Sequence, residues 1–218
     1  MILNSETAAV TAENLLQIKA IKLNVRDPFT WASGLRSPIY CDNRITLSYP
    51  GLRNHISRQL TAAVKEFFKD TEVIAGVATA GIPQGVLVAE ALGLPFVYVR
   101  SAKKSHGLTN QIEGRLEKGR SVVVVEDLVS TGKSSLAAVD ALRQAGANVK
   151  GMVAIFTYGL EIADLNFKEK ACKLITLSDY NHLIEKAAAI NYIDKNDKQT
   201  LMEWRSNPQA WSNRFENK

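Results

Sequence analysis

The chain has 218 residues, and 46% of them are hydrophobic, so it can bury a core and is not a mainly disordered chain. Its 27 lysines and arginines outnumber its 22 aspartates and glutamates, which gives a net charge of +5. This excess suits an anionic partner. Because no basic run resembles a nucleic-acid-binding arm, anionic small molecules fit at least as well.

The cysteines and the apolar stretches indicate a soluble protein of the cytoplasm. The first residues lack the basic start and apolar core of a signal peptide. Residues 73–89, the longest uncharged stretch, contain glycine and proline and predict strand, loop and helix rather than a membrane span. Cys41 and Cys172 indicate neither a disulfide framework nor a zinc site. We therefore expect neither a membrane nor nucleic acid as a partner.

The hydrophobic pattern predicts helices that alternate with strands. In chain order we expect a helix over about residues 7–23, a loop rich in Gly, Pro and Ser over 26–44, a helix over 52–68, a strand over 72–78, a helix over 82–93, a strand over 95–99, a polar stretch over 100–119, a strand over 121–126, a helix over 133–145 and a strand over 149–156. Such alternation implies a parallel sheet with right-handed crossovers. The last forty residues are expected to be helical and to pack on the same domain.

The stretch VVVVEDLVSTGKSS, residues 122–135, combines a buried strand with two carboxylates and a short loop. Its ending is similar to the phosphate-binding loop of ATPases. That motif requires glycine where this chain has Asp127, which excludes a P-loop kinase. Glu126 and Asp127 are expected at the carboxyl end of the strand, where ligands bind in such sheets.

The loop after the two carboxylates predicts a phosphate site. Its backbone N–H groups and the following helix N-terminus can face one anion, and Ser130, Thr131 and Ser134 add hydroxyl donors. Carboxylates beside a phosphate are explained if the ligand also carries neutral hydroxyls, as a ribose 5-phosphate does. The alternative is that Glu126 and Asp127 only cap the helix or face solvent.

The same stretch resembles the phosphoribosyl pyrophosphate signature of the type I phosphoribosyltransferases. Three further segments are similar to those of the family's orotate-specific branch: DPFTWASGLRSPIYCDNR (27–44), VIAGVATAGIPQG (73–85) and VRSAKKSHGLTNQIEG (99–114). The resemblance implies an α/β fold of that family, with a central, mostly parallel sheet flanked by helices. It also implies a single domain over 1–218, with an N-terminal hood over about 1–45 and a helical C-terminal extension over about 179–218.

The resemblance implies the residues that bind phosphoribosyl pyrophosphate: Arg100, Lys104, His106, Glu126, Asp127, Leu128, Val129, Ser130, Thr131, Gly132, Lys133 and Ser134. It assigns catalysis to Lys104, His106 and Asp127, and contact with orotate to Ser130. Arg100, Lys104 and His106 belong to a mobile loop that in the family closes over the neighbouring subunit's site, which implies a homodimer with shared active sites. Mg²⁺ is the implied cofactor, held mainly through the substrate and without direct protein ligands.

The implied reaction is the transfer of phosphoribose to N1 of orotate, which gives orotidine 5′-monophosphate and pyrophosphate for pyrimidine synthesis. Ala32, Ala80 and Ser101 stand where lysines are common in the family, and no ring-binding arginine is evident near residues 157–163. Two alternatives are a purine phosphoribosyltransferase and a non-catalytic sensor of phosphoribosyl pyrophosphate. The hood-like segment argues against the first, and the second would need a DNA-reading module for which the first helix leaves no room.

Overall fold

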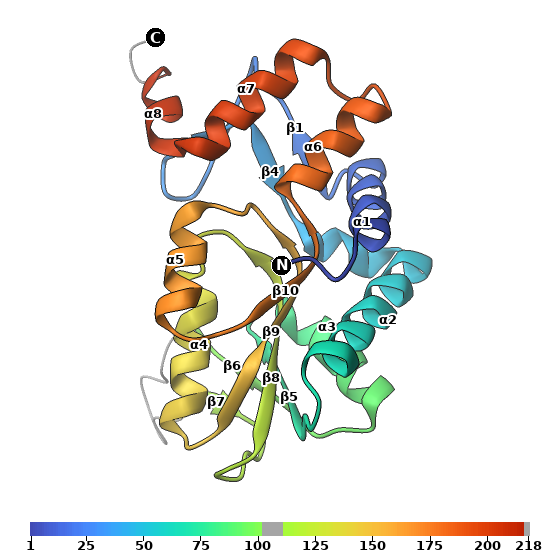
Figure 1. The fold of residues 1–218 in the computed structure, drawn as a ribbon, viewed down its shortest axis with the longest axis vertical. Helices are drawn as coiled ribbons and strands as arrows, with labels where there is room; N and C mark the ends of the chain where they lie inside the picture. Colours follow the sequence, from blue (N-terminus) through green and yellow to red (C-terminus); the bar gives the residue numbers. More distant parts are fainter. Residues whose placement is uncertain (102–110, 216–218) are drawn as a thin grey trace.

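The computed structural model describes residues 1–101 and 111–215, and a six-stranded sheet runs through their centre (Figure 1). In spatial order its strands are β10 (Leu174–Asp179), β9 (Asn148–Thr157), β8 (Ser121–Val129), β5 (Val73–Val77), β6 (Phe96–Val99) and β7 (Ile112–Glu113). Neighbouring strands are parallel, except that β7 is antiparallel to β6. The expected central, mostly parallel sheet is therefore confirmed.

Helices cover both faces of this sheet, as predicted. The helices that flank the sheet are α1 (Ser5–Gln17), α2 (Pro50–Phe67), α3 (Gly81–Leu92), α4 (Lys133–Gln144) and α5 (Glu161–Glu169). Figure 1 shows α2 and α3 on one face and α4 and α5 on the other. In the described part of the chain, no helix combines the length and apolar character that crossing a membrane requires.

The valine run of β8 is explained by burial on both faces of the sheet. Val123 and Val125 belong to the hydrophobic cluster under α1, α2 and α3, whereas Val122 and Val124 belong to the cluster under α4 and α5. Alternate residues of a strand point to opposite faces, so a strand covered on both sides needs apolar residues at every position. β8 therefore lies at the centre of the fold, and the loop after it emerges at the carboxyl edge of the sheet.

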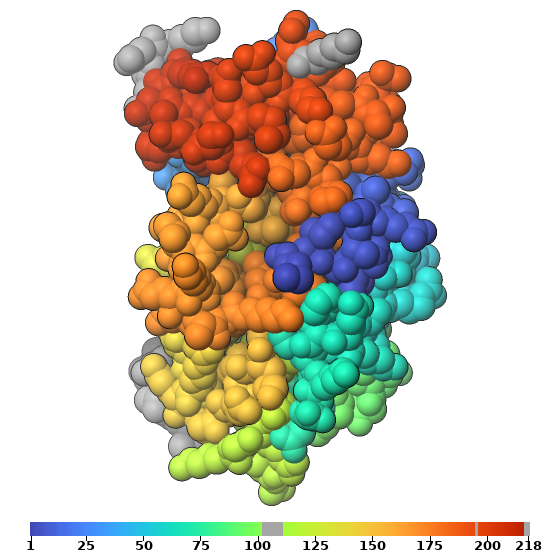
Figure 2. Space-filling view, in the orientation of Figure 1, coloured from blue at the N-terminus to red at the C-terminus, as the bar shows by residue number. Residues whose placement is uncertain are grey.

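The N-terminal strands and the C-terminal helices lie together at one end of the molecule (Figures 1 and 2). The strands are β1 (Ile21–Leu23), β2 (Phe29–Thr30), β3 (Arg36–Ser37) and β4 (Ile39–Cys41), followed by the 3-10 helix η1 (Asn43–Ser48). The helices are α6 (Tyr180–Ala189), α7 (Lys195–Ser206) and α8 (Pro208–Asn213). The backbone N–H of Arg36 donates to Ser212 Oγ at 2.9 Å. Trp31 packs edge-on against buried Trp204. We call residues 20–48 the hood.

The structure corrects several expectations at the level of single elements. The first helix ends at Gln17 rather than near residue 23, because Lys19 takes a left-handed φ of 57° and Ile21–Leu23 then pairs with β4. β8 continues past the predicted end at residue 126 and pairs with β9 as far as Val129. Strand β10 and helix α5 were not predicted, and the segments expected as a loop (26–44) and a polar stretch (100–119) contain the short strands β2, β3, β4 and β7.

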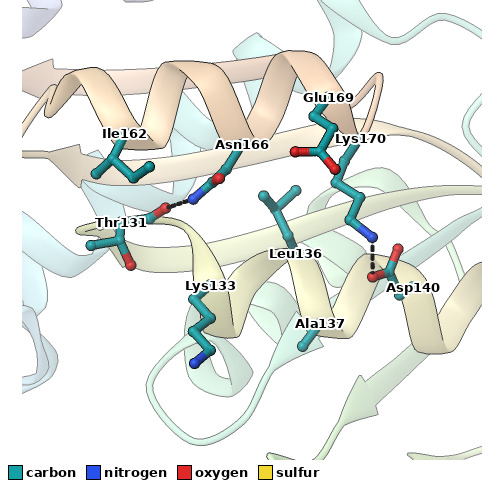
Figure 3. A pocket seen from close by; sticks show the side chains of 9 residues that line it. All are labelled: Thr131, Lys133, Leu136, Ala137, Asp140, Ile162, Asn166, Glu169 and Lys170. Carbon is teal, nitrogen blue, oxygen red and sulfur yellow. Dashed lines mark hydrogen bonds and ion pairs between the residues drawn. The ribbon is translucent and has the colours of Figure 1, made fainter.

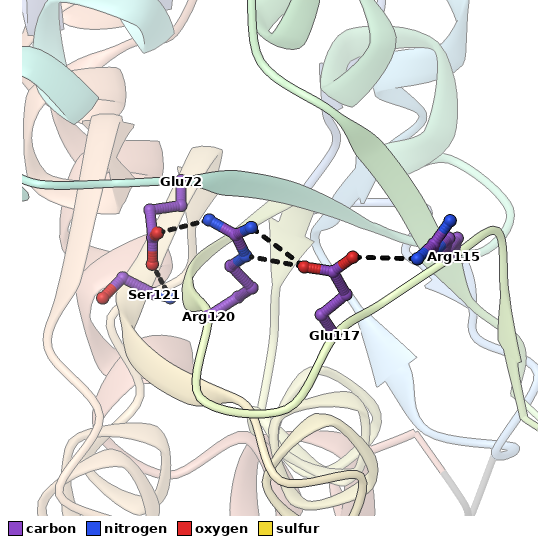
Figure 4. A network of polar contacts seen from close by, with 5 residues as sticks. All are labelled: Glu72, Arg115, Glu117, Arg120 and Ser121. Carbon is purple, nitrogen blue, oxygen red and sulfur yellow. Dashed lines mark hydrogen bonds and ion pairs between the residues drawn. The ribbon is translucent and has the colours of Figure 1, made fainter.

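A chain of ion pairs marks the opposite, amino-terminal edge of the sheet (Figure 4). Arg120 contacts Glu72 at 2.7 Å and Glu117 at 2.9 Å, and Arg115 contacts Glu117 at 3.1 Å. Glu72 also accepts the backbone N–H of Ser121, and this hydrogen bond is the main reason that its pKa lies below the usual value. Exposed pairs of this kind contribute little to stability, and they lie far from the edge that carries the phosphate loop.

Candidate active site

The two predicted carboxylates lie near the end of the central strand. Glu126 is only 5% exposed, and its side chain accepts two hydrogen bonds, one from the Ser135 hydroxyl at 2.9 Å and one from the backbone N–H of Asp127 at 3.0 Å. Asp127 is half-buried beside it. A solvent-exposed role for Glu126 is therefore excluded, and neither carboxylate caps α4.

Burial controls the protonation of this pair. Burial raises the pKa of the Glu126 carboxyl well above its ordinary value, and the charge of Asp127 raises it further. Burial also raises the pKa of Asp127, against the opposing effect of hydrogen bonds from the Glu126 carboxyl and from the Leu128 backbone. Two neighbouring carboxyls in such surroundings retain a proton at pH values where isolated carboxyls would be ionised.

The loop after β8 turns directly into helix α4. Gly132 takes a left-handed φ of 77°, which few residues other than glycine adopt without strain, and it stands at the N-cap of α4. No side chain of the described residues caps this helix. Its first backbone N–H groups can therefore face an anion, and the positive end of the helix dipole favours one.

Helix α5 holds this loop from outside. The Asn166 amide donates from Nδ2 to the backbone carbonyl of Thr131 at 2.9 Å (Figure 3). Phe167 packs so closely that a Cβ built on Gly132 would lie 2.7 Å from the ring atom Cε2. Two consecutive residues of α5 thus fix two consecutive residues of the loop.

A cavity lies between α4 and α5, beside the loop that precedes α4 (Figure 3). It has a volume of about 490 Å³, and the side chain of Lys133 lines it together with Thr131. Lys170 pairs there with Asp140 at 2.8 Å. Two of the predicted residues, Thr131 of the loop and Lys133 at the start of α4, therefore line this cavity.

The hood closes over the acidic pair and leaves a small cavity of about 270 Å³ beside it. We call this the small cavity, and its lining residues are Thr30, Trp31, Ala32, Tyr40, Cys41, Leu128, Ser130 and Tyr158. Trp31 stacks on Tyr158 with ring centroids 5.2 Å apart. Its flat, largely apolar walls and the hydroxyl of Ser130 suit a planar ring with a few polar atoms.

A second cavity, of about 610 Å³, adjoins the first and is called the large cavity. It is lined by hood residues Trp31, Ser33 and Leu35, by Ser130 and Thr131, by residues 160–162 and by residues 205–209 of the C-terminal helices. Trp31 and Ser130 line both cavities. The carboxyl edge of the sheet therefore carries one continuous group of residues from the hood, the loop and the C-terminal helices.

The structure brings most of the predicted residues together, places Arg100 apart from them, and does not describe two of them. Residues 126–134 form the end of β8, the loop and the start of α4. Arg100 follows β6, two strands away from β8, and its guanidinium lies 3.5 Å from Glu113. Lys104 and His106 lie outside the described residues. Ala32 lines the small cavity, and Ala80 precedes α3.

Four residues of this region were not found from the sequence: Asn43, Ser135, Asn166 and Arg205. Asn43 donates from Nδ2 to the backbone carbonyl of Asp127 at 2.7 Å. Only Ser135 gave a usable signal, because it stands in the first turn of the helix after the loop. The other three come from segments distant in sequence, and asparagine and arginine are common on protein surfaces.

A central parallel strand that ends in two carboxylates and an uncapped, hydroxyl-rich helix N-terminus defines a site of the phosphoribosyltransferase class. A model of the phosphoribosyl transferase domain matches residues 52–186. The chain is 55% identical over 200 residues to an orotate phosphoribosyltransferase of Staphylococcus saprophyticus, covering 92% of this chain and 98% of that protein. It is 56% identical to that of Bacteroides fragilis, covering 92% and 94%.

Solved structures agree with this likeness. The crystal structure of orotate phosphoribosyltransferase from Aeropyrum pernix is 28% identical and covers 84% of this chain and 99% of that one, with a TM-score of 0.73. The chain belongs to the phosphoribosyltransferase family and, within it, to the orotate phosphoribosyltransferases.

Proposed function

We propose that this chain transfers the phosphoribosyl group of phosphoribosyl pyrophosphate to N1 of orotate, with orotidine 5′-monophosphate and pyrophosphate as products. One observation carries the proposal: Glu126 and Asp127 lie near the carboxyl end of the central strand, directly before Leu128 and Ser130, which line the small cavity, and before the uncapped N-terminus of α4. The orotate phosphoribosyltransferases that are 55% and 56% identical to this chain support the choice of orotate as acceptor.

The arrangement separates the two chemical parts of a phosphoribosyl group. Residues 130–134, with the dipole of α4 behind them, suit the 5-phosphate. Carboxylates accept hydrogen bonds from hydroxyl groups, so Glu126 and Asp127 suit the ribose hydroxyls. Ser130 lines the small cavity, and we place the orotate ring there.

Breaking the bond between C1 of the ribose and the pyrophosphate oxygen builds positive charge on the sugar and negative charge on the leaving group. Asp127 lies on the sugar side and favours the positive charge. Cations must meet the leaving group, and we propose Arg100, Lys104 and His106 for this role, with His106 donating a hydrogen bond or a proton. Lys104 and His106 lie outside the described residues, so their roles rest on the resemblance of residues 99–114.

The same carboxylates fit a Mg²⁺ ion held largely by the substrate. Within residues 1–101 and 111–215, no three His, Cys, Asp or Glu side chains gather as a protein-only metal site would require. Mg²⁺ commonly uses one or two carboxylates together with substrate phosphates. Asp127, which is less buried than Glu126, would face such an ion across the ribose hydroxyls. When bound, Mg²⁺ would supply charge neutralisation at the pyrophosphate oxygens.

We propose a cytoplasmic location. Cys41 and Cys172 are both free, and burial raises the pKa of the Cys172 thiol to about 11. Burial also raises the pKa of the Cys41 thiol, with a further contribution from Asp127. Protonated thiols without a disulfide are typical of reducing compartments.

We also propose that the protein acts as a homodimer in which residues 99–114 of one subunit serve the site of the other. The test mixes two inactive variants, Lys104→Ala and Asp127→Asn. A hybrid dimer contains one site with both native residues, so activity should reappear after subunit exchange. If exchange is demonstrated and no activity returns, the segment acts in its own subunit.

One assay tests the reaction itself. The protein is incubated with phosphoribosyl pyrophosphate and Mg²⁺, and the loss of orotate absorbance is followed beside hypoxanthine and uracil controls. We expect turnover with orotate and none with the two neutral bases. Turnover of hypoxanthine without turnover of orotate would replace the proposal with a purine transferase, and binding without turnover would indicate a sensor.

A further inference from the structure

Arg205 of helix α7 lines the large cavity, and the reaction proposed above gives it no role. Its Nε donates to the backbone carbonyl of Gly159 at 3.1 Å, and its Nη1 donates to Asn181 Oδ1 at 2.7 Å. Gly159 follows β9, so the guanidinium lies at the carboxyl edge of the sheet, where ligands of parallel sheets bind.

The approach of this side chain to Gly159 is close. A Cβ built on Gly159 would lie 3.5 Å from Nη2 and 3.9 Å from Cζ of Arg205. Gly159 is one residue beyond Tyr158, which lines the small cavity and stacks on Trp31. Arg205 itself lines the large cavity, which shares Trp31 and Ser130 with the small cavity.

Arg205 forms no ion pair in the described part of the chain, although Asp164 and Asp179 line a separate cavity of about 150 Å³ together with it. Both of its hydrogen-bond partners are neutral, and no carboxylate of residues 1–101 or 111–215 forms an ion pair with it. Arg205 is also the only lysine, arginine or histidine among the described residues that line either cavity. The one acidic residue that lines them in this part of the chain, Glu161, is exposed at the start of α5.

Under the proposed function, the acceptor is orotate, whose carboxylate brings a negative charge to the region of the two cavities. Orotate carries a carboxylate on the ring carbon next to N1, whereas uracil is the same ring without it. A buried or half-buried carboxylate needs a charge-assisted partner, and the planar fork of arginine matches carboxylate geometry with two parallel donors. A ring in the small cavity can direct its carboxylate toward the large cavity, because the two cavities share Trp31 and Ser130.

We infer that Arg205, supplied by the C-terminal helix α7, recognises the carboxylate of orotate and so selects the anionic pyrimidine over neutral ones. The inference rests on the proposed function and assigns to the C-terminal helices a part in choosing the substrate. It differs from a purely structural role, in which Arg205 only ties α7 to β9 and α6 through Gly159 and Asn181.

A second arginine provides the comparison. Arg36 of the hood donates from Nη1 to Thr30 Oγ1 at 2.8 Å, and Thr30 lines the small cavity. Arg214, which pairs with Glu203 at 3.1 Å and lines neither cavity, is a matched control for removing an arginine from the C-terminal helices.

The experiment compares Arg205→Gln, Arg205→Lys, Arg36→Gln and Arg214→Gln with the unaltered protein. KM and kcat are measured for orotate and for phosphoribosyl pyrophosphate, and initial rates are measured with the neutral carboxamide analogue of orotate. For Arg205→Gln we expect the KM for orotate to rise about 10- to 100-fold, the scale of one lost charge-assisted hydrogen-bonded pair. The KM for phosphoribosyl pyrophosphate should stay within about threefold, the rate with the carboxamide should not change, and Arg205→Lys should recover part of the loss.

Each other result has a definite meaning. If KM for both substrates, kcat and thermal stability change together in Arg205→Gln, Arg205 is only a structural tie and the inference is wrong. It is equally wrong if Arg36→Gln alone raises the KM for orotate. If the unaltered protein turns over orotate and Arg205→Gln matches it, the function stands and the inference fails. If the unaltered protein does not use orotate, the proposed function itself fails, and the inference with it.

Discussion

Asn43 Nδ2 donates a 2.7 Å hydrogen bond to the backbone carbonyl of Asp127, and so joins the hood to the acidic pair. Asn43 is 2% exposed, and its Oδ1 lies 3.4 Å from Cys41 Sγ, a residue of the small cavity. The two segments are 84 positions apart in sequence. One buried amide therefore connects the wall of the small cavity with the backbone of Asp127, whose side chain we propose to contact the ribose.

Replacing Asn43 with alanine should affect both stability and activity. The Asp127 carbonyl loses a buried donor, which costs about 1–3 kcal/mol of unfolding free energy. Because the hydrogen bond also positions Asp127, we expect kcat/KM for both substrates to fall by about tenfold. Denaturant unfolding and steady-state kinetics measure the two effects.

The control for Asn43 is Asn14→Ala. Asn14 is a half-buried asparagine whose Nδ2 donates to the Val10 carbonyl within α1. It should leave kcat/KM unchanged. An Asn43→Ala protein with lower stability and native kcat/KM would show that the hydrogen bond holds the hood without positioning Asp127.

Asp127→Asn removes the charge that we propose to lie next to the ribose and keeps the shape of the side chain. Loss of the charge that favours the developing positive sugar should lower activity by at least about tenfold, the scale of roughly 1.4 kcal/mol. The fold should be intact by circular dichroism and thermal unfolding. Native turnover in this variant would contradict the placement of the ribose beside Asp127.

Much of the sheet could be predicted because the hydrophobic pattern and the turn residues along the sequence mark where its strands and helices lie. The run Val122–Val125 has no polar face, and Gly93 ends α3 in the left-handed conformation, with φ 65°, that a helix-ending glycine adopts. The acidic pair and the loop were also found, because a motif contiguous in sequence keeps its geometry wherever it occurs. The extension of β8 to Val129 was missed, since pairing with β9 decides where the strand ends.

The rest of the site could not be predicted because it is assembled from distant segments. The contacts of Asn43, Asn166 and Arg205 span 84, 35 and 46 positions, respectively. Asn43 lies within the family-like segment 27–44, but the resemblance gave it no role; Asn166 and Arg205 stand in no recognised motif, and a polar residue on a helix is ordinarily assigned to solvent. Only the packing of the hood, of α5 and of α7 against the carboxyl edge brings them to the site.

Gly132→Ala tests the contact between α5 and the phosphate loop. At a φ of 77°, alanine is strained by about 1 kcal/mol or more, and its Cβ would lie 2.7 Å from the ring of Phe167. The loop must then shift, so we expect the KM for phosphoribosyl pyrophosphate to rise by about tenfold, the scale of about 1.4 kcal/mol of lost binding.

Gly119→Ala provides the matched comparison, because Gly119 has a similar φ of 84° but no atom within 4 Å of a built Cβ. It should show the backbone strain in its unfolding free energy and leave that KM unchanged. Equal effects of the two variants on KM would mean that the fit between Phe167 and the loop does not matter for binding.

The buried carboxyl of Glu126 makes the stability of the substrate-free protein depend on pH. Burial raises the pKa of this carboxyl above its unfolded value, so over the interval between the two values the native state binds more protons than the unfolded state. The stability contribution of the protonated form is complete below the unfolded pKa, near the ordinary value of 4.5, and is lost as the pH rises through the folded pKa. Ionised Glu126 therefore opposes folding at neutral pH.

Glu126→Gln should accordingly raise the stability of the substrate-free protein and lower its activity. Glutamine is neutral at every pH, and it can still accept the Asp127 N–H while donating to the Ser135 hydroxyl. We expect the variant and the unaltered protein to unfold alike near pH 4, and the variant to be more stable at pH 7 by on the order of 1 kcal/mol, as is usual when a strained site residue is relieved. Activity should fall at least about tenfold, because the amide N–H₂ cannot accept a ribose hydroxyl. Denaturant unfolding at several pH values, without Mg²⁺ or substrate, measures the first effect. A stability difference that does not depend on pH, or a variant less stable at pH 7, would show that burial of Glu126 does not oppose folding.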